Sequence, residues 1–211
     1  RWLADEVKQS FLKDYPVQVI PNGVDQTIFR PTENDLRKKL GLEHSFVILG
    51  VANVWERRKG LSYFCGLAKK LPEDCKIILI GLNEKQIRKL PEEIIGITRT
   101  ENAEELAGYY SMADVFVNAT LEDNFPTTNL EALSCGTPVI TFETGGSPES
   151  LDKTCGRVVR KGDAEALLQA ILAAREHPMR KEDCLTRAVQ YEKNDRFMEY
   201  AALYHRLWGQ G

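Results

Sequence analysis

The 211-residue chain has few residues of the kinds that hold metals or form disulfides. It contains five cysteines, an odd number, and they are scattered without any Cys-x-x-Cys spacing. This pattern indicates neither a disulfide framework nor a zinc site, so we expect reduced, mostly buried thiols. His44, His177 and His205 are isolated from one another, and we assign none of them to catalysis or ligand binding.

The sequence also lacks long apolar runs, internal repeats and a strong net charge. No stretch approaches the about 18 apolar residues of a membrane span, and the start, Arg-Trp-Leu-Ala-Asp-Glu, has no signal-peptide pattern. These two absences lead us to expect a cytoplasmic protein. A net charge of −3 argues against nonspecific binding to nucleic acid, which normally needs a basic face.

What is present is the alternation of short apolar runs with helical stretches. This pattern is typical of a parallel sheet covered by helices on both faces, and it predicts a Rossmann-like three-layer α/β fold. The predicted strands are residues 17–21, 46–52, 76–81, 94–98, 115–118 and 138–142, with 156–159 as a further candidate. The predicted helices are residues 33–40, 61–71, 84–90, 103–112 and 126–135, followed by helical stretches after Asp163 that end in 194–208.

Residues 122–140 hold the most informative motif. Asp123 and Glu131 lie eight residues apart around a predicted helix start. Pro126 is tolerated in the first helical turn because its missing N–H has no intrahelical partner there, and Asn124 just before it can cap the helix. Taken alone the pair is a weak signal, since one acidic residue on a helix is usually just solvated.

The predicted helix start suits a phosphate-bearing ligand. The first free amides, at Thr127, Thr128 and Asn129, are expected to point outward with the positive end of the helix dipole. One turn further in, the Glu131 carboxylate can accept two hydrogen bonds from vicinal hydroxyls such as those of a ribose. Asp123 on the entry loop then faces whatever the phosphate carries.

A second glycine-containing loop follows the next predicted strand. Thr-Gly-Gly-Ser-Pro-Glu comes after residues 138–142 and leads into another helix. Two such loops at adjacent strand ends build one pocket. Gly145 and Gly146 either let the backbone approach a ligand closely or merely form a turn, and both interpretations stay open here.

Four motifs together resemble one known family. Asp123 to Glu131, followed by Ala-Leu-Ser-Cys-Gly-Thr-Pro-Val-Ile, resembles the Glu-x7-Glu signature of retaining glycosyltransferases with the GT-B fold, family 4. Val19 to Asp25 resembles the family's "IPNGVD" turn, Arg58-Lys59-Gly60 its "KG" donor-phosphate loop, and Tyr110 to Val117 its "Y..aDvfv" strand. The motifs occur in the family's order, and the resemblance covers nearly the whole chain.

The resemblance implies that the chain is one half of a GT-B fold. Residues 1–15 would be a linker from an acceptor-binding domain that the chain lacks, and 16–192 the donor-binding domain. Residues 193–211 would be a helix that crosses to the other domain, unless its apolar stripe packs on its own sheet. On this reading the chain is a fragment that is inactive alone.

The activity implied is transfer of a hexosyl or deoxyhexosyl group in polysaccharide or glycoconjugate assembly. The donor would be a UDP- or GDP-sugar, and a glycan or lipid-linked acceptor would bind through the other domain. The full-length enzyme would be a candidate for peripheral membrane association. No metal is expected, because the Asp-x-Asp motif of metal-dependent sugar transferases does not occur.

The resemblance also assigns roles to the two carboxylates. Asp123 and Glu131 are the candidate catalytic pair, with Asp123 on the donor sugar and Glu131 on the ribose. The family usually has Glu at the first position, whereas this chain has Asp123 preceded by Glu122, so either carboxylate can fill that role and the spacing favours Asp123. Asn53 stands where the family usually has an Arg, and one expected phosphate cation is therefore missing.

Binding of the diphosphate and nucleoside is assigned in the same way. Arg58, Lys59, Thr127 and Thr128 are the candidate diphosphate ligands, although without the resemblance the basic run would be interpreted as a solvated loop. The candidate residues for the nucleoside and ribose, besides Glu131, are Asn83 and Thr100, near the ends of two predicted strands. For Asn83 the alternative is a cap on the next helix.

Two other functions compete with the transferase hypothesis. A nucleotide-sugar epimerase of similar fold would need a charged catalytic set that this chain does not display. A bare nucleotide-binding module would bind nucleotide and transfer nothing. Titration of the chain with UDP, GDP, ADP and CMP tests the donor site, because no binding by any of these nucleotides would rule it out.

Overall fold

Six parallel strands form the centre of the fold. The computed structural model describes residues 1–209, and residues 210 and 211 of the predicted terminal segment 193–211 lie outside the described residues. The strands lie in the order β3-β2-β1-β4-β5-β6, and all neighbouring pairs are parallel. Their bounds are β1 (Phe46–Val51), β2 (Cys75–Ile80), β3 (Ile94–Ile97), β4 (Val115–Asn118), β5 (Val139–Phe142) and β6 (Gly156–Val159).

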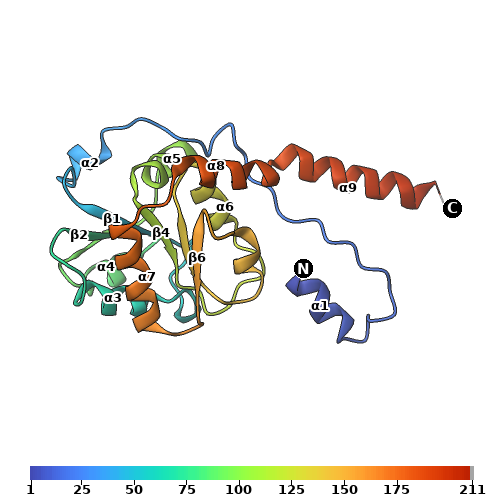
Figure 1. Ribbon diagram of the computed structural model, residues 1–211, viewed down its shortest axis with the longest axis horizontal. Coiled ribbons are helices and arrows are strands. Elements are labelled where there is room, and N and C mark those ends of the chain that lie inside the picture. The colour runs from blue at the N-terminus through green and yellow to red at the C-terminus, as the bar shows by residue number, and fades with distance from the viewer. Residues whose placement is uncertain (210–211) are drawn as a thin grey trace.

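Helices cover both faces of this sheet (Figure 1). The α-helices are α1 (Trp2–Lys8), α2 (Leu36–Lys39), α3 (Leu61–Ala68), α4 (Glu84–Ile87), α5 (Ala103–Met112), α6 (Thr127–Ser134), α7 (Ala164–Glu176), α8 (Lys181–Ala188) and α9 (Lys193–Trp208). The described residues 1–209 also contain three short 3-10 helices, η1 (Arg57–Lys59), η2 (Ser147–Ser150) and η3 (Val189–Tyr191). The predicted Rossmann-like α/β fold is confirmed.

Alternating side chains of the strands build two cores, one on each face. Ile48 of β1 packs in the core that includes Phe64 of α3 and Leu167 of α7. Its neighbour Val47 packs in the core on the other face, with Leu133 of α6. Because successive side chains of a strand point to opposite faces, a strand covered on both sides is apolar throughout.

The strand order reverses at β1, which lies between β2 and β4. In open parallel sheets, ligands bind outside the carboxyl ends of the strands at such a reversal. The loops that follow β1 and β4 start after Val51 and Asn118. They contain the basic run and the acidic motif that the sequence singled out.

The strand predicted at residues 17–21 is wrong. Within residues 1–209 this segment pairs with no strand, and Val17 and Val19 are 42% and 46% exposed. Its alternating valines fit the pattern of a half-buried strand, but the pattern alone does not supply a pairing partner. Further on, the N–H of Val24 donates to the carbonyl of Tyr191 at 2.8 Å.

Several helices are shorter than predicted. The stretch predicted as 33–40 is helical only at Leu36–Lys39, after Asn34 accepts a hydrogen bond from the N–H of Leu36 in a local turn. The helices predicted at 61–71 and 84–90 end at Ala68 and Ile87. Turn hydrogen bonds replace the helical ones in the residues that follow.

Helix α9 extends away from the α/β body (Figure 1). Helix α1 meets the body at its start, where the amino group of Arg1 lies 2.6 Å from a carboxylate oxygen of Glu149. No residue of α9 is buried, and its apolar side chains do not pack on the sheet of this chain. The large exposed apolar residues of α9 are Phe197, Met198, Tyr200, Tyr204, Leu207 and Trp208. Within residues 1–209, no helix is long and apolar enough to cross a lipid bilayer.

Candidate functional site

The loops after β1 and β4 are docked against each other through their backbones. The N–H of Leu121 donates to the carbonyl of Arg58 at 2.7 Å. Gly60 has φ +79°, and a Cβ there would lie 2.1 Å from the carbonyl oxygen of Ala119. Only glycine fits this close approach, so the loop that carries Lys59 is held at a fixed distance from the loop that carries Asp123.

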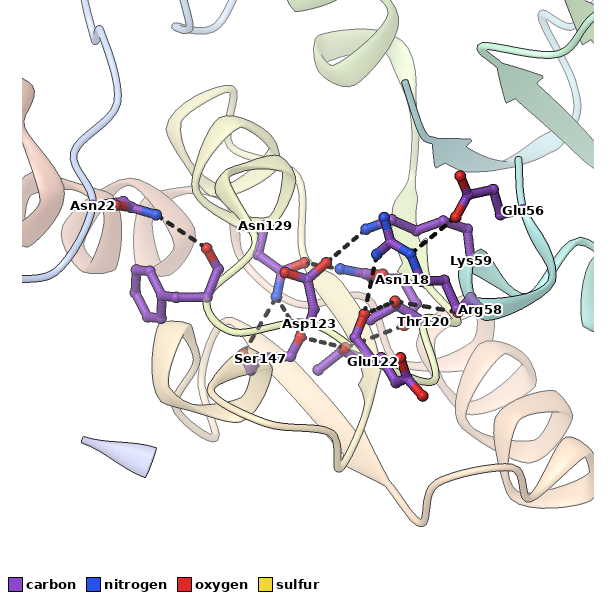
Figure 2. A network of polar contacts seen from close by, with 12 residues as sticks. Asn22, Glu56, Arg58, Lys59, Asn118, Thr120, Glu122, Asp123, Asn129 and Ser147 are labelled. Carbon is purple, nitrogen blue, oxygen red and sulfur yellow. Dashed lines mark hydrogen bonds and ion pairs between the residues drawn. The ribbon is translucent and has the colours of Figure 1, made fainter. Parts of the chain in front are cut away.

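Lys59 and Asp123 form an ion pair at the centre of the site. The Nζ atom of Lys59 lies 2.6 Å from Oδ2 of Asp123, and the two side chains are only 22% and 18% exposed (Figure 2). The Glu122 carboxylate points away from Lys59 in the same view. Of the two acidic candidates, Asp123 is therefore the one that reaches the predicted phosphate-binding cation.

Arg58 lies at the edge of this arrangement. Its Nε donates to a carboxylate oxygen of Glu56 at 3.1 Å, and Nη1 reaches the carbonyl of Glu122 at 3.5 Å (Figure 2). The side chain is 45% exposed. Arg58 is thus more loosely held than Lys59, and its predicted contact with a diphosphate stays a prediction.

Helix α6 begins one residue later than predicted, and the predicted Asn124 cap is wrong. Pro126 occupies the N-cap position with extended backbone angles and no capping side chain, which leaves Asn124 two residues ahead of the cap. The N–H of Asn129 already donates to the carbonyl of Pro126 at 3.3 Å. Among residues 1–209, the amides of Thr127 and Thr128 have no such partner, so two of the three predicted amides remain available.

Glu131 is not a solvated helix residue. Its Oε2 accepts a hydrogen bond from the hydroxyl of Tyr110 at 2.9 Å. Burial raises the pKa of Glu131 above its usual value, and hydrogen bonds from Tyr110 and Thr127 act in the opposite direction. The site therefore holds one half-buried, hydrogen-bonded carboxylate a turn inside the helix and one ion-paired carboxylate on the entry loop.

Gly145 and Gly146 lie against the backbone of the acidic loop. Gly145 has φ +51°, and a Cβ there would be 1.9 Å from the carbonyl oxygen of Asp123. A Cβ at Gly146 would be 2.1 Å from the carbonyl oxygen of Asn124. Both glycines are needed for this turn and this contact, while a close approach to a donor stays a prediction.

A buried polar network that the sequence reasoning missed supports these loops. The side-chain amide of Asn129 donates to the hydroxyls of Ser147 and Ser150 at 3.0 Å each, and its oxygen accepts from Asn118 at 2.9 Å (Figure 2). Thr141 of β5 completes the network through the Ser147 hydroxyl at 2.7 Å. The network joins β4, β5, α6 and η2. The signal in the sequence was an Asn on the apolar face of a helix.

Asn83 and Thr100 lie after β2 and β3, at the same edge of the sheet. Asn83 forms a capping box with Gln86 at the start of α4, so the structural alternative is realised. Thr100 is half-buried in the loop before α5. Nothing in the described contacts connects either side chain with the ion pair, and their nucleoside roles stay predictions.

The segment before β1 closes one side of the site. The side chain of Asn22 donates to the carbonyl of Phe125 at 3.3 Å (Figure 2). A Cβ at Gly23 would lie 2.5 Å from the Cα of Lys193. The "IPNGVD" turn, residues 19–25, therefore packs closely against the start of α9. A pocket of about 470 Å³ opens here, and its lining includes Asn22, Asp123, Asn124, Phe125 and Tyr200.

The described residues offer no obvious metal centre. Between residues 1 and 209, no group of three or more His, Cys, Asp or Glu side chains is arranged to hold an ion. The groups that the site presents to a ligand are its cation, its two carboxylates and its helix amides. A donor site without metal stays a prediction.

Comparison with known proteins identifies the family. The family Glycosyl transferases group 1 matches residues 45–177, more than half of the chain, and the chain belongs to this family. The D-inositol 3-phosphate glycosyltransferase of Corynebacterium jeikeium is 29% identical over 175 residues, which cover 70% of this chain and 42% of that protein. The chain thus spans less than half the length of this relative.

Two solved structures have similar folds. Sucrose-phosphate synthase from Thermosynechococcus elongatus matches with a TM-score of 0.87 and 23% identity, over 100% of this chain and 57% of that one. Anabaena HepE in complex with UDP-glucose matches with a TM-score of 0.79 and 19% identity, over 90% of this chain and 57% of that one. At these identities the matches show the shared fold.

Proposed function

We propose that this chain is the donor-binding half of a retaining glycosyltransferase that takes its sugar from a nucleotide-diphosphate sugar. One observation carries the proposal. The carboxyl edge of the sheet brings together a half-buried cation, two helix amides and two differently held carboxylates, which belong to Lys59, Thr127, Thr128, Asp123 and Glu131. This set supplies one partner for each part of such a donor.

The leaving group of this transfer is a nucleoside diphosphate, on which negative charge grows as the glycosidic bond breaks. Lys59 and the positive end of α6 stabilise that charge. The Lys59 ammonium has three donors, so it can contact a phosphate oxygen while it still donates to Asp123. Arg58 is proposed as a second, more exposed cation for the diphosphate.

The remaining contacts are assigned to the nucleoside and the sugar. Glu131 is proposed to accept hydrogen bonds from the ribose hydroxyls, with Asn83 and Thr100 near the base. Asp123 is proposed to accept from hydroxyls of the donor sugar. A uridine or guanosine donor fits this proposal, and the fold shared with Anabaena HepE, which was solved with UDP-glucose, supports it.

The acceptor is proposed to bind another domain of a longer enzyme, in which a glycan or lipid-linked acceptor is extended in the cytoplasm or at its membrane surface. The shares of the relatives that this chain covers support a longer enzyme. The exposed apolar side chains of residues 1–15 and of α9 fit a contact with that domain. Alone, the 211-residue chain is expected to bind donor and transfer nothing.

Calorimetric titration of the 211-residue chain with UDP, GDP, ADP and CMP tests the proposal. We expect at least one diphosphate to bind. Lys59→Ala and Glu131→Ala should each weaken that binding by about 1–3 kcal/mol, because each removes a charge-assisted hydrogen bond in a partly buried site. Lys38→Ala, an exposed lysine of α2, is the matched control. No binding by any nucleotide would overturn the donor-site assignment.

A further inference from the structure

The hydroxyl of Tyr110 lies directly behind the proposed ribose-binding carboxylate. Tyr110 belongs to α5 and is fully buried. Its hydroxyl donates to Oε2 of Glu131 at 2.9 Å, and within residues 1–209 this is the hydrogen bond that the hydroxyl makes. A buried tyrosine hydroxyl needs such a partner, and here the partner is a group proposed to bind ligand.

The surroundings of Tyr110 hold this hydroxyl in one place. Phe116 and Phe29 contact its ring edge-on, with centroid distances of 5.4 and 6.2 Å. The hydroxyl of Thr137 donates to the backbone carbonyl of Tyr110 at 2.6 Å. The ring therefore has little freedom, and its hydroxyl is directed at Glu131 before any ligand arrives.

A carboxylate offers about four acceptor positions on its two oxygens. Tyr110 occupies one of them on Oε2, which fixes the plane of the Glu131 carboxylate and leaves acceptor positions for a pair of neighbouring hydroxyls. Burial alone would favour the neutral acid, which accepts less well. The tyrosine hydrogen bond favours the charged form and so opposes the larger effect of burial.

We propose that Tyr110 is a positioning residue that holds the Glu131 carboxylate oriented to recognise the vicinal 2′- and 3′-hydroxyls of a ribonucleoside diphosphate. The inference rests on the proposed donor site and adds a reason why that site should select ribose. It predicts that the Tyr110 hydroxyl matters only for ligands that carry those hydroxyls.

Few other groups near Glu131 can titrate. Cys135, one turn further along the chain, faces it, and burial raises the pKa of this thiol to about 12. The positive charge of Lys181 on α8 acts against this effect and lowers the pKa of the Cys135 thiol. Burial also raises the pKa of Tyr110 well above its ordinary value. Because burial raises the pKa of both groups, Cys135 and Tyr110 stay neutral over the pH range in which Glu131 changes its charge.

The test compares Tyr110→Phe with Tyr109→Phe. Tyr109 is the buried neighbour on α5, and its hydroxyl does not contact Glu131. The ligands are whichever of UDP, GDP and ADP the wild type binds best, and its 2′,3′-dideoxy form. We expect Tyr110→Phe to weaken ribonucleotide binding about fivefold or more and to leave dideoxynucleotide binding unchanged. Tyr109→Phe should change neither.

The pH profile supplies a second readout. The charged Glu131 binds the hydroxyls, so binding is present above its pKa and is lost as the pH falls through it. Without the tyrosine hydrogen bond that pKa rises, and Tyr110→Phe should lose ribonucleotide binding at higher pH than the wild type. If Tyr110→Phe does not fold, 3-fluorotyrosine at position 110, a stronger donor, should shift the loss to lower pH.

The outcomes separate this inference from the proposed function. A wild type that binds no nucleotide overturns the donor site itself. A wild type that prefers the ribonucleotide, with the same preference and pH profile after Tyr110→Phe or fluorination, overturns only the role of Tyr110. An equal loss for both ligand forms in Tyr110→Phe would reduce Tyr110 to a structural residue.

Discussion

At the scale of single residues, the Lys59–Asp123 pair is the feature that most constrains the chemistry. Both side chains are largely withdrawn from water. Removing one partner of such a pair leaves the other charge uncompensated. Asp123 compensates the positive charge of Lys59. A bound diphosphate would therefore have to share the Lys59 ammonium with Asp123.

Asp123→Asn is therefore expected to strengthen the binding of free nucleoside diphosphate. The substitution removes a negative charge near the phosphates and frees the Lys59 ammonium, and we expect a gain of about threefold to tenfold, or up to about 1.4 kcal/mol. A nucleotide sugar should gain less, because its sugar loses the Asp123 contact. Isothermal titration of both ligands measures the difference.

Glu122→Gln is the matched control for this substitution. The Glu122 carboxylate points away from Lys59 (Figure 2), so its neutralisation should leave both affinities nearly unchanged. If Glu122→Gln instead reproduced the effects of Asp123→Asn, the first acidic role would belong to Glu122. The spacing argument from the sequence would then be wrong.

At the scale of elements, the network around Asn129 joins the helix start to the glycine loop. Asn129→Ala would leave the buried hydroxyls of Ser147 and Ser150 and the amide of Asn118 without this partner. Because unsatisfied buried polar groups are costly, we expect the free energy of unfolding to fall by about 2–4 kcal/mol. Urea denaturation measures it.

An exposed asparagine provides the comparison for Asn129→Ala. Asn194 lies in the first turn of α9 and is exposed, so Asn194→Ala should change the free energy of unfolding by less than about 0.5 kcal/mol. A similarly small effect for Asn129→Ala would mean that the network does not hold the two loops together.

The same elements show what the sequence could predict. The runs that became β1, β2, β4 and β5 are mostly apolar, because helices cover both faces, and local pattern suffices to find them. Residues 17–21 have a strand-like pattern as well, but a strand needs a neighbour, which no local pattern reveals. The hydrogen bonds of Asn129 likewise depend on β4, β5 and η2 meeting, and these elements are distant in sequence.

For the site, the sequence predicted which residues take part better than it predicted which of them contact each other. The motif spacing identified Lys59, Asp123 and Glu131, which lie at the same edge of the sheet. It did not predict that Lys59 and Asp123 pair with each other, or that Tyr110 binds Glu131. Asn124 was assigned a cap that the start of α6 at Thr127 excludes. The two contacts depend on where elements that are distant in sequence meet in space.

At the scale of the whole molecule, the α/β body differs from the first 20 residues and α9 in how far its apolar side chains are buried. The sheet and its covering helices bury two continuous cores. The first 20 residues and α9 leave large apolar side chains exposed, among them Phe11 at 89% and Trp208 at 90%. Apolar surface of this extent marks a contact, which fits a domain that works as part of a larger enzyme.

The most direct test of the donor site is an NMR titration of the isotope-labelled 211-residue chain with UDP and GDP. We expect the largest amide shift changes at Lys59, Thr127, Thr128 and Glu131, with little change in the strand β6 and α7 at the far edge of the sheet. Shift changes centred on β6 and α7, or no saturable change with either nucleotide, would contradict a donor site at the carboxyl ends of β1 and β4.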